Sequence, residues 1–399
     1  MEADRNAPQH ADLADLEAAV GLARLAGMLR AEAANGLYWG AEPEEGARLR
    51  RLRVHAAALM AEVDHRSSAE ILAIFEGDTV LRTPLPGTEF RIVCGDGTRI
   101  VHRKRLGERT LGSRVAAVAA ALGAEVPEGP FAIADTDLCN LPCPHTYLLV
   151  YEFATALDGG AVTALLEPGD PDLEGYLLEL APEASAVRLE RKPLRVSAAV
   201  REILAEVAAL AAEALETVDS PYGLERRERI SALCEHTEAA EVAYPRIDCG
   251  DLAAPCVSTG ADAAVFDDEG RLLVIRRTDT GQWAVPGGMA EVGEPVGMSA
   301  VREAAEETGL DVELTSLSWA FDKRDTNLGD SRAPMIMSFT ARRIDVDQPI
   351  RLAELEASDH RWVTREEAAE LDLFRGHELR VPAAFARHVP RGWPKRPLG

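Results

Sequence analysis

The sequence lacks any apolar run long enough to cross a bilayer, which argues against a membrane-spanning protein. Its first twenty residues, MEADRNAPQHADLADLEAAV, are polar and acidic, without the apolar core of a signal peptide. We therefore expect a cytoplasmic protein with no membrane partner.

Basic residues are scarce relative to acidic ones. The 399 residues include 43 Lys and Arg against 67 Asp and Glu, a formal net charge of -24. A surface with this excess repels nucleic-acid backbones, so we expect no nucleic-acid partner. An acidic protein that handles a phosphorylated compound needs a bound metal ion or a local basic patch to hold it.

Cysteines are also few. The six in the chain are scattered, which is typical of reduced thiols. The segment CNLPCPH, residues 139–145, contains two cysteines and a histidine that zinc could bind. Its spacing is not that of a standard ligand pair, and no second pair follows. We interpret these residues as ordinary thiols.

A chain of this length is too long for one ordinary hydrophobic core, so we expect more than one domain. Apolar residues recur at helical spacing from about 12 to 64 and again from 197, whereas strand patterns surround the turn glycines Gly97 and Gly270. The patterns predict four parts: a helical segment (1–64), an α/β module (65–200), a helical segment or linker (201–250) and a catalytic domain (251–399).

The order of helices and strands repeats along the chain. Gly123 and Gly309 end corresponding predicted helices, and Phe153 and Phe339 close corresponding predicted strands, both pairs 186 positions apart. We favour a tandem duplication. The alternative is that residues 1–200 form an unrelated α/β domain and that two Ala-rich segments resemble each other by composition.

The stretch GQWAVPGGMAEVGEPVGMSAVREAAEETGL, residues 281–310, carries the chemistry. Within it Glu303, Glu306 and Glu307 fall at i, i+3 and i+4, so all three carboxylates lie on one helix face. Like charges at this spacing destabilise a helix by about 0.2–0.5 kcal/mol per pair. A divalent cation would remove that repulsion; the alternative is a solvated acidic face.

The spacing of this stretch resembles the signature of the Nudix hydrolase family at all seven fixed positions, and only the aliphatic place after Glu303 departs mildly, as Ala304. The fixed positions are Gly288, Glu294, Arg302, Glu303, Glu306, Glu307 and Gly309. The resemblance implies an α/β/α sandwich with a mixed sheet between helices. It also implies Mg²⁺- or Mn²⁺-dependent hydrolysis of a pyrophosphate bond in a nucleoside diphosphate linked to another moiety.

The resemblance assigns roles to these residues. Glu303, Glu306 and Glu307 would be metal ligands together with the carbonyl of Gly287, and Glu303 or Glu306 would polarise the attacking water. Arg302 and Glu294 would pair and pin the glycine loop, which includes Gly288, to the helix. Gly309 would end the helix in a conformation that a side chain opposes.

Further site residues lie outside the motif. The family often draws another base or ligand from a later loop, here LAELEASDHRWV, in which Glu354, Glu356 and Asp359 are candidates and Glu356 is our choice. Alternatively, all three are exposed loop acids. Substrate phosphate could be reached by Arg276 and Arg277, which end a predicted strand, and by Arg324. The alternative for the arginine pair is a plain basic strand end.

The first copy lacks the acidic residues. At the 186-residue offset, Ala117, Ala120 and Ala121 stand where the three glutamates stand, and its glycine loop is shorter. We predict a degenerate Nudix-like module without a metal site. The helical segments resemble those ahead of some bacterial Nudix domains, where they are associated with dimer contacts, so a homodimer is one expectation.

Two other functions fit the same motif. The first is a regulatory protein that senses a nucleotide without turnover, and the second is a (d)NTP pyrophosphohydrolase. A Nudix-type isomerase would need a cysteine in the cleft, and Cys256 precedes the first strand and is poorly placed for that.

Overall fold

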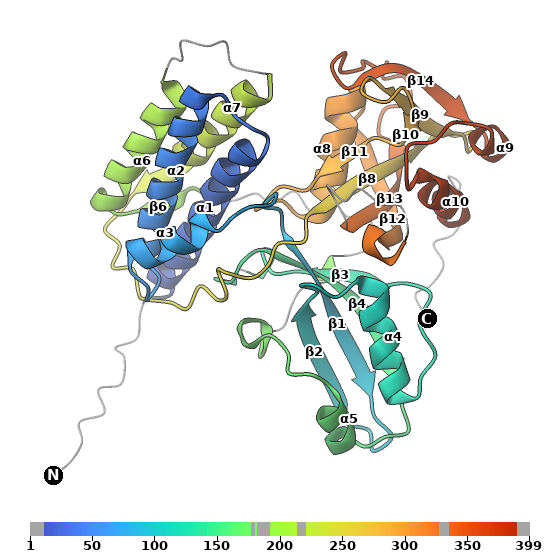
Figure 1. Ribbon diagram of the computed structural model, residues 1–399, viewed down its shortest axis with the longest axis horizontal. Helices are drawn as coiled ribbons and strands as arrows, with labels where there is room; N and C mark the ends of the chain where they lie inside the picture. Colours follow the sequence, from blue (N-terminus) through green and yellow to red (C-terminus); the bar gives the residue numbers. More distant parts are fainter. Residues whose placement is uncertain are drawn as a thin grey trace. The chain divides into compact units, whose positions relative to one another are not determined.

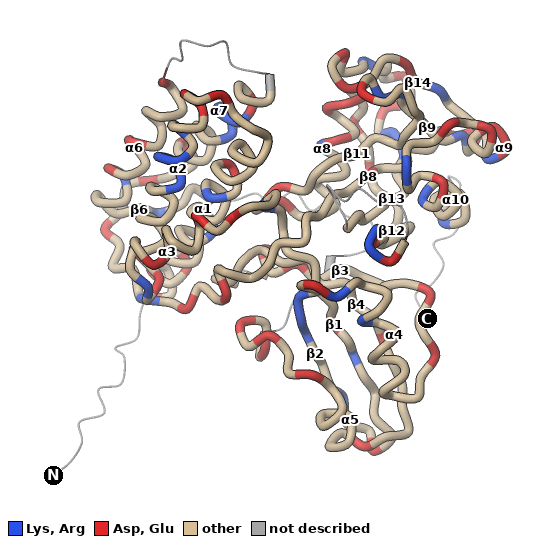
Figure 2. The backbone as a smooth tube through the Cα atoms, viewed as in Figure 1, with Lys and Arg blue, Asp and Glu red and all other residues tan. Residues whose placement is uncertain are grey.

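The computed structural model describes residues 12–139, 141–176, 180–181, 192–213, 221–326 and 335–388, which fall into two compact units (Figure 1). Unit 1 combines residues up to 82 with 140–144 and 190–254, and unit 2 combines 83–139, 145–189 and 255–399. Among the described residues, no helix is both long and apolar enough to cross a membrane. Acidic and basic residues are interspersed along the chain in both units (Figure 2).

Unit 1 is helical. It contains α1 (Leu13–Tyr38), α2 (Pro43–Ala61), α3 (Ser68–Glu76), α6 (Ala198–Ala212) and α7 (Pro221–Glu235), with the short parallel strands β6 (Leu194–Val196) and β7 (Thr237–Ala239). The helix starts follow from the sequence, because Asp12 and Ser197 cap α1 and α6 and a capping box at Ser67 starts α3. Leucines from the first three helices and valines from α6 share one core, so helices far apart in the chain fold together.

The first sheet of unit 2 has the strand order β2-β1-β4-β3-β5. Its strands are β1 (Leu85–Val93), β2 (Arg99–Arg105), β3 (Ala132–Asp135), β4 (Thr146–Ala154) and β5 (Leu180–Ala181); its helices are α4 (Leu111–Leu122), α5 (Gly159–Leu165) and the 3₁₀ turn η1 (Pro171–Leu173). β1 and β2 form the predicted antiparallel hairpin, and β1 pairs in parallel with β4.

The second sheet has the order β10-β9-β8-β13-β12, with β11 beside β8 and β14 beside β9. Its strands are β8 (Thr259–Phe266), β9 (Leu272–Arg277), β10 (Trp283–Ala284), β11 (Gly287–Met289), β12 (Val312–Asp322), β13 (Met335–Arg343) and β14 (Ala357–Val363). Its helices are α8 (Val296–Thr308), the 3₁₀ turn η2 (Lys323–Asp325), α9 (Arg365–Ala369) and α10 (His377–Arg387). β8 and β13 are parallel, whereas the other pairs are antiparallel.

This sheet lies between helices, because alternate side chains of β8 pack against helices on opposite faces. Ala261, Ala263 and Val265 pack in one core cluster with residues of α8, whereas Ala264 and Phe266 pack in another with residues of α10. The mixed sheet sandwiched between α8 and α10 confirms the predicted α/β/α fold.

The two sheets share a strand order. The path β2-β1-β4-β3 in the first corresponds to β9-β8-β13-β12 in the second, with one parallel pair at the centre of each. The helices α4 and α8 both end at a left-handed glycine, Gly123 and Gly309. The common order agrees with the predicted duplication, which stays a hypothesis. The predicted module boundaries at 65 and 200 also stay a hypothesis; by contact, α3 and β6 lie in unit 1.

Candidate active site around helix α8

Two glycines of β11 allow helix α8 to approach the sheet. A Cβ at Gly287 would lie 2.4 Å from the Cβ of Asp262, and one at Gly288 would lie 2.6 Å from the carboxylate of Glu303. Gly287 has no room for a side chain, because backbone atoms of β8 also lie within 2.7 Å, whereas a side chain at Gly288 would displace the Glu303 carboxylate. At its other end α8 stops at Gly309, whose φ of 70° favours glycine. The glycine loop and the helix are therefore built to place α8 carboxylates against the β11 main chain.

Glu307 is the most deeply fixed of the three glutamates. Its side chain is buried, and Oε2 accepts a hydrogen bond from the main-chain NH of Gly287 at 2.8 Å. Burial raises the pKa of Glu307 well above its ordinary value, and the neighbouring charge of Glu303 raises it further, while the Gly287 hydrogen bond opposes both. A buried carboxylate of this kind favours a bound cation.

Glu303 lies in a similar environment. Burial raises its pKa to about 7, although the adjacent Arg302 opposes the shift and the charges of Glu306 and Glu356 add to it. Glu306 differs from both in exposure, because its side chain is 56% exposed. Like Glu303, it accepts a hydrogen bond from Arg302, at 3.0 Å. Of the three glutamates on this helix, Glu307 is buried, Glu303 has 12% of its side chain exposed, and Glu306 is exposed.

Arg302 connects the glycine loop to the helix. Its guanidinium donates to the carboxylates of Glu303 at 2.9 Å and Glu294 at 3.2 Å and to the carbonyl of Met289 at 3.0 Å. Glu294 also accepts from the hydroxyl of Ser299 at 2.8 Å. The predicted pairing of Arg302 with Glu294 is present in the structure, within a wider network that includes two of the proposed metal ligands.

Glu356 lies close to these glutamates. It is half-buried just before β14, and its negative charge raises the pKa of both Glu303 and Glu307. The other two candidates of that loop, Glu354 and Asp359, are exposed. The structure thus places Glu356, the acid chosen from the sequence, near the glutamates of α8.

The two arginines that end β9 point in different directions, because successive side chains of a strand alternate. Burial lowers the pKa of Arg277, but nearby acids, including Asp279, Glu307 and Glu356, outweigh it and raise the pKa. Its guanidinium pairs with Asp279 at 2.8 Å and lies 4.5 Å from the centre of the Phe374 ring. Arg276 is exposed and donates to the carbonyl of Gly281 at 2.9 Å. Of the pair, Arg277 is the one beside the glutamates.

Arg324 donates to protein oxygens in the structure. Its guanidinium donates to Asp322 at 2.8 Å and to the carbonyls of Gly107 and Arg109, each at 2.9 Å. Those carbonyls belong to the first module of unit 2, the part built on the β2-β1-β4-β3-β5 sheet (residues 83–139 and 145–189). The contact between Arg324 and the substrate stays a prediction, and it would require these donors to leave their protein partners.

A buried polar group beneath α10 was not anticipated from the sequence. Arg380 forms an ion pair with Asp262 of β8 and lies 2.9 Å from Nδ1 of His377. Burial lowers the pKa of His377 well below its ordinary value, and the positive charges of Arg380, Arg277 and Lys323 lower it further. These residues come from distant parts of the chain and belong to no recognisable motif, so no local pattern reveals them.

The donor set suits a divalent cation, although the side chains are not arranged around one. Among the residues that the structure describes, no group of three or more His, Cys, Asp or Glu side chains has metal-binding geometry. Arg302 holds Glu303 and Glu306 in ion pairs, and Glu307 is bonded to Gly287. Carboxylate oxygens are nevertheless the ligands that Mg²⁺ and Mn²⁺ prefer. Burial first, and neighbouring carboxylates second, raise the pKa of Glu303 and Glu307, and a bound cation would favour the ionised form of both.

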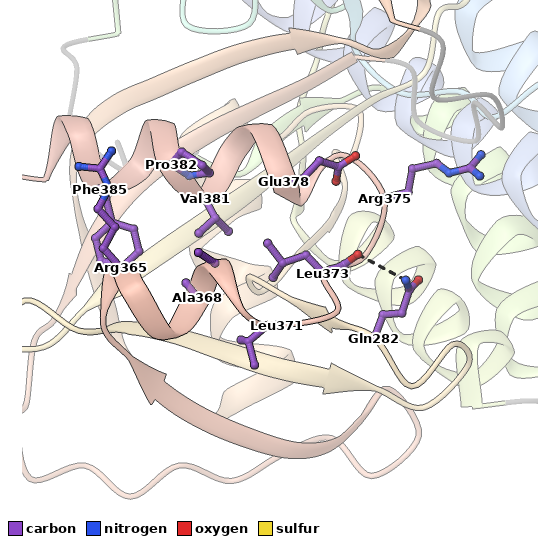
Figure 3. Close-up of a pocket in the computed structure, with 11 residues that line it drawn as sticks. Gln282, Arg365, Ala368, Leu371, Leu373, Arg375, Glu378, Val381, Pro382 and Phe385 are labelled. Atoms are coloured by element: carbon purple, nitrogen blue, oxygen red, sulfur yellow. Dashed lines mark hydrogen bonds between the residues drawn. The ribbon is translucent and has the colours of Figure 1, made fainter.

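A separate pocket of about 700 Å³ is lined by residues of α9, α10 and the segment 371–375 that joins them (Figure 3). Leu371, Leu373, Val381 and Phe385 give it an apolar lining, and Arg365, Arg375 and Glu378 add charged groups. Gln282 also lines the pocket, and its amide lies 3.4 Å from the carbonyl of Leu373 (Figure 3). Its walls come from α9, α10 and their neighbours, whereas the glutamates described above are on α8.

Comparison with known proteins identifies the fold that carries this site. The family model described as NUDIX domain matches residues 258–383, and this part of the chain is a NUDIX domain. The family resemblance seen in the sequence is thereby confirmed, and the match runs from the start of β8 into α10.

Individual relatives cover limited parts of the chain. A MutT-like protein of Streptomyces ambofaciens is 40% identical over 67 residues, 17% of this chain and 44% of that protein. Nucleoside diphosphate-linked moiety X motif 6 of Xenopus laevis is 42% identical over 59 residues, 14% of this chain and 27% of that protein. The chain therefore spans less than half the length of either relative. A crystal structure of a UDP-X diphosphatase has a TM-score of 0.37 at 18% identity and covers 46% of this chain and 91% of that one.

Proposed function

We propose that this protein is a metal-dependent pyrophosphohydrolase that cleaves a nucleoside diphosphate linked to another moiety. The observation that carries the proposal is the close packing of Glu303 and Glu307 against the glycines of β11, with Glu356 close enough to raise the pKa of both. The NUDIX domain and the Xenopus laevis relative, whose name specifies a nucleoside diphosphate-linked moiety, support the substrate class.

Four groups would hold a Mg²⁺ or Mn²⁺ ion: the carboxylates of Glu303, Glu306 and Glu307 and the carbonyl of Gly287. The ion, when bound, would neutralise the pyrophosphate and make a water molecule more acidic. Glu303 and Glu306 would have to leave their ion pairs with Arg302, which would keep its bonds to Glu294 and Met289 and so retain the loop.

The other steps belong to side chains near the helix. Glu356 would take the proton of the attacking water, because it is the half-buried acid beside the glutamates of α8. Oxygen from that water then bonds to phosphorus, the pyrophosphate bond breaks, and the departing phosphate keeps the electron pair. Arg277 would donate to a phosphate oxygen and exchange its pairing with Asp279 for the substrate.

A substrate panel tests the proposal. The purified protein is incubated with Mg²⁺ and ADP-ribose, CDP-choline, nucleotide sugars or deoxynucleoside triphosphates, and the products are separated by ion-exchange chromatography. We expect nucleoside monophosphate from the linked diphosphates and loss of turnover in Glu307→Gln. Preference for triphosphates would favour the (d)NTP pyrophosphohydrolase, and full turnover by Glu307→Gln would contradict the metal assignment.

One observation favours the regulatory alternative. Arg302 already neutralises Glu303 and Glu306, so the site could bind a nucleotide without assembling a metal centre. Nucleotide binding measured by calorimetry, with no product from any compound of the panel, would identify a sensor. A cytoplasmic location, a homodimer and the absence of a nucleic-acid partner remain predictions.

A further inference from the structure

The first module of unit 2 is bonded to the catalytic loop. Between β11 and α8, the main-chain NH of Gly293 donates to Nδ1 of His145 at 2.9 Å, and the hydroxyl of Tyr147 donates to the carbonyl of Glu294. His145 immediately precedes β4 and Tyr147 lies within it, 6% and 0% exposed respectively. Two adjacent residues of the loop are therefore held by the first module through their main chain.

His145 is itself held by contacts with Asp135 and the Tyr147 ring. Its Nε2 lies 2.9 Å from a carboxylate oxygen of Asp135, the last residue of β3, and the Tyr147 ring meets it edge-on with 4.9 Å between ring centres. Because the NH of Gly293 can only donate, Nδ1 must be the acceptor, and the ring proton sits on Nε2 and faces Asp135. The histidine is thus oriented to accept from the loop.

A second set of bonds joins the same two modules at the loop after β12. The carboxylates of Asp322 and Asp325 accept from the main-chain NH groups of Leu111 and Gly112, at 2.8 and 2.7 Å, at the start of α4. Negative charge is stabilised at the N-terminus of a helix, and α4 is twelve residues long. Residues of α4 and β4 also share one core cluster with residues of α8, so the contact is continuous.

The bonds at Gly293 and Glu294 lead directly to the proposed metal ligands. The carboxylate of Glu294, whose carbonyl Tyr147 holds, accepts from Arg302, and Arg302 donates to Glu303 and Glu306. A displacement of the loop would move Glu294 and, through Arg302, the carboxylates of the helix. The first module is placed to determine where those carboxylates lie.

We propose that the first module is a positioning module for the catalytic helix, with His145 and Tyr147 as positioning residues that act through Glu294 and Arg302. The inference rests on the proposed function, because one of its measurements is metal binding at the proposed site. It extends that function by assigning the first module a role in positioning the carboxylates of α8. The groups that support a metal site from outside its ligands typically affect metal affinity or activity about 10–100-fold.

The test uses the full chain and two readouts. We expect Tyr147→Phe and His145→Ala to weaken Mn²⁺ binding, measured by electron paramagnetic resonance, by about 10–100-fold. We also expect faster hydrogen exchange in residues 290–299, measured by mass spectrometry. His145→Asn should recover part of both effects, because its side-chain oxygen can accept from Gly293 near the place of Nδ1.

Tyr151→Phe is the matched control, because it removes another buried hydroxyl from β4 at a place that is not bonded to residues 293–294. Unchanged exchange and metal binding in both Tyr147→Phe and His145→Ala would overturn the proposal, as would equal losses in Tyr151→Phe. The two proposals can fail separately. If the wild-type protein hydrolyses nothing on the panel but loop exchange is faster in Tyr147→Phe, the positioning role is supported and only the proposed hydrolase function is rejected.

Discussion

Glu303 links metal binding to pH. Its pKa of about 7, set first by burial, means that in the folded metal-free protein the carboxyl carries a proton at pH 6, whereas in the unfolded chain it is ionised. The folded state then binds more protons than the unfolded state between the ordinary value of 4.5 and about 7, so the metal-free protein loses stability as pH rises through that window.

Metal binding should favour the ionised form of Glu303, because a carboxylate must be ionised to act as a ligand. We expect Mg²⁺ affinity to rise between pH 6 and pH 7.5 and binding at pH 6 to release a proton. Calorimetry in two buffers with different ionisation enthalpies measures that release, and Glu303→Gln should reduce it, leaving the contribution of Glu307, whose pKa burial also raises. Equal heats in the two buffers for the wild-type protein would contradict the expectation.

Glu356 is the second residue whose environment yields a distinct expectation. As the half-buried acid beside the helix it should serve as the general base, so Glu356→Gln should lower kcat by about 10²–10⁴-fold with little change in KM. Glu354→Gln is the matched control, two positions away and exposed. Steady-state kinetics on the best substrate of the panel compares them, and equal activities would remove Glu356 from the mechanism.

At the scale of elements, the alternation of side chains along β9 directs Arg276 and Arg277 to opposite faces of the sheet. Loss of a charge-assisted hydrogen bond to phosphate costs about 1.5–3 kcal/mol, so Arg277→Ala should lower kcat/KM by roughly 10–100-fold. Arg276→Ala should stay within about twofold, because its side chain is exposed and donates to Gly281. Similar losses in both variants would mean that β9 does not present Arg277 to the substrate in the way proposed.

The elements that could be predicted are those whose signals are local. The hairpins, helix α8 and the glycine that ends it follow from apolar periodicity, turn glycines and the spacing of the motif. The ion pair of Asp262 with Arg380 joins residues 118 positions apart, and Arg324 turns toward carbonyls more than 200 positions earlier. Such contacts depend on how elements pack, and no short-range pattern carries that information.

At the scale of the whole molecule, unit 1 closes around segments that are far apart in the chain. Asp64, at the end of the first helical segment, is 1% exposed; it pairs with Arg66 at 2.6 Å and accepts from the main-chain NH of Cys249 at 3.3 Å. Burial by itself would raise the pKa of Asp64, but the hydrogen bonds from Arg66 and Cys249 outweigh it and lower the pKa to about 2.

This carboxylate therefore stabilises unit 1 above pH 3.8, and its contribution is lost as pH falls from 3.8 to about 2. The shift corresponds to about 2 kcal/mol at neutral pH, so Asp64→Asn should lower the free energy of unfolding of unit 1 by that order. Hydrogen exchange in increasing urea follows peptides of α1 and β8 separately and should show the loss in α1 at pH 7. The exposed neighbour Asp248→Asn is the control. An equal loss in β8 would show that the two units unfold as one, whereas no loss in α1 would mean that Asp64 does not join the segments of unit 1.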